Sequence, residues 1–117
     1  MLFVCYPKCS TCQKAKKWLT EHELSFEERD IKTENPTKEE LEEWYKKSGL
    51  PLKRFFNTSG VLYKEMKLKD RLPEMTEEEQ LELLSTDGML VKRPILVTEE
   101  KVFTGFKEKE WESLKDC

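Results

Sequence analysis

The chain has 117 residues, 37% of them hydrophobic and 38% charged, and its 24 acidic and 21 basic side chains give a net charge of −3. This length accommodates one domain with a single hydrophobic core, and the negative balance of charge argues against a nucleic-acid-binding surface. The chain starts without a positively charged region, and it has no apolar run near the ~18 residues of a membrane span. We therefore expect a cytoplasmic protein in which residues 1–117 form one domain, with neither a signal peptide nor a membrane helix.

The first third of the chain predicts a strand, a helix and a second strand. Residues 1–6 are an apolar run that Pro7 closes, as expected of a short buried strand. Residues 9–21 have the spacing of an amphipathic helix, and residues 26–31 suit a second strand. The apolar positions that share one face of the predicted helix are Cys12, Ala15, Trp18 and Leu19. Because a helix that crosses over between two strands makes them parallel, we expect a β-α-β unit.

Residues 35–90 predict a helical insertion. Thr37 with Glu40, and Thr76 with Glu79, are capping-box pairs that mark the starts of two helices. Between these helices the aromatic and aliphatic residues have no long periodicity, as expected of several short helices. The segment has no Gly/Ser-rich linker and no internal repeat, so we expect it to belong to the same domain.

The closing segment predicts a hairpin and a last helix. Pro94 stands at the start of a β-branched run, a position where proline is tolerated in a strand. Residues 99–101 can turn the chain into a second short strand, and residues 107–115 predict a helix. The order of elements is therefore β-α-β, helices, β-β-α. With a cysteine pair after the first strand and a proline before the third, this α/β order is typical of the thioredoxin fold, here with a mixed four-stranded sheet and a helical insertion.

The Cys9-Ser10-Thr11-Cys12 motif lies where the first strand gives way to the first helix, and it predicts a thiol-disulfide site. The thiolate is the form that attacks disulfides, and Cys-x-x-Cys cysteines at helix N-termini reach pKa values of about 3.5 to 7.5. Unpaired backbone N–H groups and the helix dipole favour the anion there. Residues three apart on a helix are neighbours, so Cys12 can reach the sulfur of Cys9. We therefore expect Cys9 to attack and Cys12 to resolve, in a reducing compartment where such a pair is catalytic or sensing.

Other interpretations of the cysteines remain open. A structural zinc site needs four ligands, and the further candidates are Cys5, Cys117 and His22, so we expect no metal. Counted from Cys5, the cysteines have the spacing C-x3-C-x2-C, which resembles the cluster motif of radical S-adenosylmethionine enzymes. Those enzymes need a barrel of about 200 residues, and this chain has 117. Cys5 is better suited to pack as a small apolar side chain in the first strand. An incidental pair without a redox role is the remaining alternative.

Four stretches in chain order carry a resemblance to a known family. They are Tyr6-Pro7-Lys8-Cys9-Ser10-Thr11-Cys12-Gln13-Lys14-Ala15, Phe56-Asn57-Thr58-Ser59-Gly60, Tyr63-Lys64-Glu65 and Lys92-Arg93-Pro94-Ile95. With them the whole chain resembles the arsenate reductase-like (ArsC/Spx) family, which has a thioredoxin-like fold with a helical insertion. The resemblance implies one of two activities and no bound cofactor. One branch reduces arsenate with a single thiolate and an external glutathione or glutaredoxin. The other, the Spx and MgsR regulators, uses a Cys-x-x-Cys redox switch and binds the RNA polymerase alpha subunit.

The resemblance also implies roles for individual residues. Cys9 matches the nucleophile of the family, and Arg93 matches the arginine that helps to hold the oxyanion. Pro94 matches a cis-proline, which would place backbone groups and the Arg93 side chain beside Cys9. Ordinary X-Pro bonds are cis only about 5 to 6% of the time, so this expectation comes from the resemblance alone.

Departures from the reductase branch guide the choice of function. Asn57 and Phe106 stand where our alignment gives the reductases two further arginines, and Arg54 is near enough to replace one of them in part. Loss of two charge-assisted hydrogen bonds removes roughly 3 to 6 kcal/mol, or about 100-fold to 10,000-fold in oxyanion affinity. The reductases also have a small residue where Cys12 stands. We therefore predict a thiol oxidoreductase that uses Cys9 and Cys12 and a glutaredoxin or thioredoxin-type reductant. A redox-sensing regulator that binds the polymerase alpha subunit is the alternative, and arsenate reduction comes third.

Overall fold

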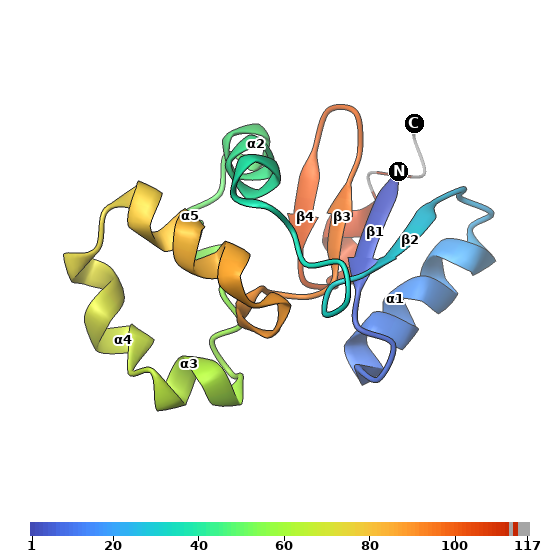
Figure 1. Ribbon diagram of the computed structural model, residues 1–117. Helices are drawn as coiled ribbons and strands as arrows, with labels where there is room; N and C mark the ends of the chain where they lie inside the picture. The colour runs from blue at the N-terminus through green and yellow to red at the C-terminus, as the bar shows by residue number, and fades with distance from the viewer. Residues whose placement is uncertain (113, 115–117) are drawn as a thin grey trace.

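A computed structural model of the protein describes residues 1–112 and 114 (Figure 1). Its strands are β1 (Leu2–Cys5), β2 (Glu27–Asp30), β3 (Ile95–Val97) and β4 (Val102–Thr104). They form one sheet in the order β2-β1-β3-β4. β1 pairs in parallel with β2 and antiparallel with β3, and β3 pairs antiparallel with β4. The predicted α/β fold with a mixed four-stranded sheet is confirmed.

Helix α1 (Ser10–Glu21) connects β1 to β2 and so makes their pairing parallel, as predicted. The four side chains that α1 buries are the predicted ones, Cys12, Ala15, Trp18 and Leu19. They pack on one face of the sheet with Phe3, Leu96 and Trp111, the last of which belongs to α6 (Glu108–Trp111). Aromatic rings meet edge to face in this layer, with the Trp18 and Trp111 centroids 5.8 Å apart.

The helical insertion lies on the other side of the sheet from α1 (Figure 1). Its elements are α2 (Lys38–Ser48), η1 (Leu52–Phe55), α3 (Val61–Glu65), α4 (Leu68–Arg71), η2 (Leu72–Glu74), α5 (Glu77–Thr86) and η3 (Gly88–Leu90). Both predicted capping boxes are present, because Thr37 and Thr76 each accept a hydrogen bond from the backbone N–H three residues later and the glutamate there accepts in return. The left-handed Gly49 follows the last residue of α2.

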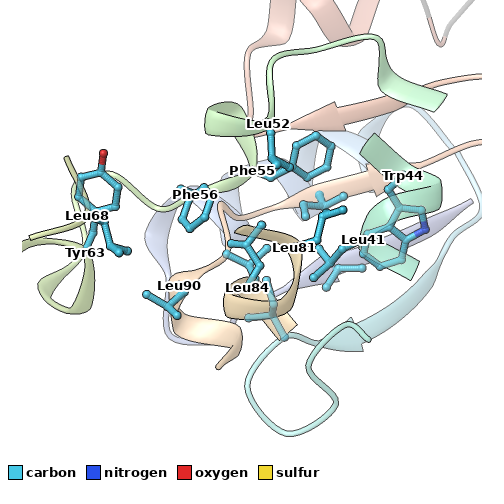
Figure 2. Packing of buried hydrophobic residues seen from close by; sticks show 14 of the residues in the cluster. Leu41, Trp44, Leu52, Phe55, Phe56, Tyr63, Leu68, Leu81, Leu84 and Leu90 are labelled. Atoms are coloured by element: carbon cyan, nitrogen blue, oxygen red, sulfur yellow. The ribbon is translucent and has the colours of Figure 1, made fainter. Parts of the chain in front are cut away.

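The core of the insertion is continuous with the sheet. Figure 2 shows its side chains converging from α2, α5 and the short helices between them. Leu41, Phe55 and Leu84 are fully buried, and Val4 and Ile95 of the sheet belong to the same hydrophobic cluster. The insertion and the sheet therefore share one core.

An ion pair connects the start of α2 to the edge strand β2. The Arg29 guanidinium donates two hydrogen bonds to the Glu40 carboxylate, from Nη1 at 2.6 Å and from Nη2 at 2.9 Å. This hydrogen-bonded pairing lowers the pKa of Glu40 to about 2. The same carboxylate accepts from the Thr37 N–H in the capping box, so it serves both the helix start and the edge of the sheet.

The C-terminal region is described only in part. Of the helix predicted over residues 107–115, α6 covers Glu108–Trp111, and the remainder lies partly outside the described residues, as does Cys117. Within residues 1–112 and 114, every helix is too short or too polar to cross a membrane.

Candidate thiol active site

The turn between β1 and α1 fixes Cys9 at the start of the helix. Cys9 is the N-cap residue of α1, with an extended backbone, and its own N–H donates to the carbonyl of Tyr6 at 2.9 Å. The side-chain amide of Gln13 donates to the carbonyl of Pro7 at 2.9 Å and holds the turn against the first helical residues. Cys9 is half-buried, whereas Cys5 and Cys12 are buried.

The surroundings of Cys9 favour its thiolate. Burial by itself would raise the pKa of this thiol and is the largest single influence, and the backbone N–H of Cys12 and the Arg93 guanidinium are the two largest that oppose it. With smaller contributions from the Cys12 thiol and the Thr11 N–H, they lower the pKa of Cys9 below its ordinary value. The predicted role of unpaired N–H groups in the first turn of a helix therefore has a structural basis here.

Cys12 has the opposite character. It is buried, and burial together with the neighbouring Cys9 raises its pKa to about 12. The N–H of Tyr6 donates to the Cys12 sulfur at 3.3 Å, and this contact partly offsets the rise in pKa. The two thiols interact directly, with Cys9 as the favoured anion and Cys12 as the protonated partner. Both are in the reduced state in this structure.

Cys5 interacts with a carboxylate of β2. Its buried thiol donates to the Glu28 carboxylate at 3.6 Å, and that carboxylate forms an ion pair with Lys16 at 2.8 Å. Burial and the charge of Glu28 raise the pKa of Cys5 to about 12. The expectation that Cys5 packs in the first strand is confirmed, because it is 2% exposed and lies in the cluster beneath α1.

The loop before β3 brings Arg93 to the cysteine pair. The Arg93-Pro94 bond is cis, as the resemblance implied, and the Pro94 carbonyl accepts a hydrogen bond from the Gly105 N–H at 2.8 Å. The Arg93 guanidinium lies 5.2 Å from the centroid of the Tyr6 ring, within cation–π range. Its Nε and Nη1 atoms are buried and have no hydrogen-bond partner among the described residues. The described residues therefore leave these two buried donors unsatisfied.

A cavity of ≈ 710 Å³ joins Cys9 to parts of the chain that are far apart in sequence. Arg93 and Arg54 line this cavity, and so do Asn57 and Phe106, the two positions that replace reductase arginines. The predicted site residues Cys9, Arg54 and Arg93 are thus brought together. Cys12 and Pro94 are not among the residues that line the cavity.

Several residues that line the cavity were not predicted as site residues. Lys92 and Lys107 add two cations to the cavity, and Val61 and Thr104 form part of its wall. Lys92 adjoins Arg93 and Lys107 adjoins Phe106, so their closeness to predicted positions was an available signal. Val61 and Thr104 had no such signal, because an aliphatic residue after a glycine and a threonine in a strand are common in any fold.

Comparisons with known proteins agree with this geometry. A protein from Bacteroides fragilis, described as related to the ArsC family, has a crystal structure that matches with a TM-score of 0.94 and 62% identity, over 97% of this chain and 95% of that one. The uncharacterized protein YusI of Bacillus subtilis is 56% identical over 96% of this chain and 95% of its own length. The regulatory protein MgsR of the same organism is 36% identical over 91% of this chain and 82% of its own.

The family model described as ArsC family matches residues 5–114, which include the cysteine pair, the helical insertion and the loop before β3. This match spans nearly the whole chain and agrees with the residues that first carried the resemblance. The chain belongs to the ArsC family.

Proposed function

We propose that this protein is a cytoplasmic thiol-disulfide oxidoreductase, with Cys9 as the nucleophile and Cys12 as the resolving thiol. The observation that carries the proposal is the contrast between two interacting sulfurs. The pKa of Cys9 is lowered, that of Cys12 is raised to about 12, and Cys9 lines the cavity whereas Cys12 is buried and does not line it. A site with a half-buried thiolate that lines a cavity and a buried, protonated thiol suits sequential attack and resolution.

The first step is an exchange at Cys9. Its thiolate attacks one sulfur of a substrate disulfide, so that a Cys9–substrate disulfide forms, the substrate's own disulfide breaks, and the second substrate sulfur leaves as a thiolate. Arg93 stabilises the thiolate of the free protein and has two further buried donors for a polar group of the substrate.

The second step is resolution by Cys12. Its thiol loses a proton as it attacks the Cys9 sulfur, a Cys9–Cys12 disulfide forms, and the substrate sulfur departs and takes up the proton. The substrate disulfide is reduced by two electrons and the cysteine pair is oxidised by two. The Tyr6 N–H, 3.3 Å from the Cys12 sulfur, stabilises negative charge as it develops on that atom. Glutathione, glutaredoxin or a thioredoxin-type protein then supplies two electrons to regenerate the pair.

The test is stoichiometric reduction of bis(2-hydroxyethyl) disulfide by the pre-reduced protein, followed by mass mapping of the cysteines. We expect the unaltered protein to end with a Cys9–Cys12 disulfide. Cys12→Ser should stop at a mixed disulfide on Cys9, and Cys9→Ser should not react. Cys5→Ser is the matched control and should behave like the parent, because Cys5 contacts Glu28 and does not line the cavity. Oxidation of the unaltered protein at a pair other than Cys9 and Cys12 would refute the assignment.

A second function, redox-sensing regulation, is favoured by the similarity to MgsR, a regulatory protein that this chain matches over 91% of its length. In this function the oxidised Cys9–Cys12 pair would be the signal and not a catalytic intermediate. The partner implied by the family resemblance is the RNA polymerase alpha subunit. Binding of purified alpha subunit to the reduced protein, to the oxidised protein and to Cys9→Ser separates the two functions. No binding in either redox state would exclude the regulator.

A further inference from the structure

The charge of the cavity at Cys9 differs from that of the whole chain. Four cations line it, Arg54, Lys92, Arg93 and Lys107, and no acidic side chain of the described residues does. The chain as a whole carries a net charge of −3, so this concentration of positive charge is not an average property of the surface. A cleft lined by one sign of charge raises the local concentration of ligands of the opposite sign.

The rim of the same cavity has an apolar side. Val61 is 69% exposed, and Met1 is the one other large hydrophobic side chain that is exposed among residues 1–112 and 114. Leu62, Met89 and Phe106 line the cavity together with Val61. These four side chains form an apolar part of the wall of the cavity that Cys9 also lines, and an apolar group of a ligand gains free energy by covering it. The ligand should therefore carry an apolar group as well as negative charge.

A second cavity adjoins the main one. This cavity of ≈ 260 Å³ shares the wall residues Arg54 and Thr104 with the first, and Lys47, Lys101 and Glu110 contribute the other charged groups. The Thr104 side chain is 5% exposed, and its hydroxyl has no hydrogen-bond partner among the described residues. A hydroxyl in the wall shared by two cavities can donate a hydrogen bond to a backbone carbonyl group or accept one from a backbone amide group.

We propose that the two cavities form one groove that binds a cysteine-containing segment of an acidic polypeptide. The cysteine sulfur of this segment lies at Cys9, an apolar side chain next to it covers Val61, and acidic side chains face Arg54, Lys92 and Lys107. Three observations favour a polypeptide over a small thiol: the exposed apolar rim, the second cavity and the unpartnered Thr104 hydroxyl. This inference rests on the proposed function and names the class of its substrate.

The probe is a pair of synthetic peptides that each carry one cysteine as a 2-thiopyridyl mixed disulfide. Leucine flanks the cysteine in both, with glutamates further out in one peptide and lysines at the same places in the other. Cys9 attacks the peptide sulfur, a Cys9–peptide disulfide forms, and pyridine-2-thione leaves and is followed by its absorbance. The 2-thiopyridyl disulfides of 2-mercaptoethanol and of glutathione serve as a neutral and an anionic small-thiol reference.

At low salt we expect the acidic peptide to react about 10-fold faster than the basic one, a ratio that shrinks at high salt. Val61→Ser and Lys107→Gln should each lower the rate of the acidic peptide relative to the neutral reference. Lys109→Gln removes the same charge two residues away and outside the cavity, and it should leave that ratio unchanged.

Equal rates for the two peptides would overturn the proposal. So would a glutathione derivative that matches the acidic peptide and is insensitive to Val61→Ser, since that result indicates a small-thiol site. Failure of the neutral reference to react at Cys9 would instead refute the oxidoreductase function.

Discussion

Replacement of Arg93 by methionine should raise the pKa of Cys9. The guanidinium interacts with the Cys9 sulfur and is one of the two largest influences that favour the thiolate. A hydrogen bond to a charged group contributes about 1.5 to 3 kcal/mol, so its loss should raise the pKa and lower the ionised fraction of Cys9 by about 10-fold to 100-fold where the thiol is mostly protonated. Part of the lost reactivity returns because a thiolate of higher pKa is the stronger nucleophile. The alkylation rate of Cys9 near neutral pH should therefore fall by at most about 10-fold.

The assay is alkylation by iodoacetamide across a pH series, with the modification of each cysteine quantified by peptide mass mapping. Lys92→Met is the matched control, because Lys92 lines the same cavity and carries the same charge but is not among the groups that face the Cys9 sulfur. Its effect on the pKa should be much smaller than that of Arg93→Met. An unchanged pKa in Arg93→Met, or equal shifts in the two variants, would refute the assigned role of the guanidinium.

Two further predictions concern stability. Glu40 has a pKa of about 2 in the folded protein against an ordinary 4.5, so its contribution is complete above pH 4.5 and is lost as the pH falls toward 2. Glu40→Gln should cost about 2 kcal/mol at pH 7, a figure reduced for solvent screening, and urea unfolding should show this deficit shrinking below pH 4.5. Gly49→Ala should cost about 1 kcal/mol in urea unfolding, because φ is +68° and no atom lies within 4 Å of the added Cβ. A neutral Gly49→Ala would show that the left-handed turn is not maintained in solution.

Much of the fold follows from local sequence signals. The two helices before residue 50 can be predicted because each has its own periodicity, and α2 also has Thr37 before it and Gly49 after it. The first strand follows from its apolar run, and the second, which alternates poorly, follows from its place after the first helix. The parallel pairing of β1 and β2 follows from the helix between them. The short helices between Leu52 and Glu74 could be predicted as a class but not placed, because packing against the shared core sets their positions.

Part of the candidate site, too, can be predicted from local sequence signals, and part cannot. Cys9 and Cys12 were predicted because their chemistry needs only a strand, a turn and a helix in sequence. The cavity could not be predicted, because its walls come from the insertion, the loop before β3 and the end of β4, which meet only in the folded chain. The hydrogen bond from the Tyr6 N–H to Cys12 is likewise a product of the turn geometry, since no side-chain pattern marks a backbone donor.

The most direct test of the account is a titration of the two thiols of the unaltered, reduced protein, followed by site-resolved alkylation of Cys9 and Cys12. We predict that the pKa of Cys9 is lower than the ~8.5 of a free cysteine and that Cys12 stays protonated throughout the neutral range. A Cys9 pKa at or above that of a free cysteine would contradict this prediction, and so would equal alkylation rates for Cys9 and Cys12 at pH 6.5.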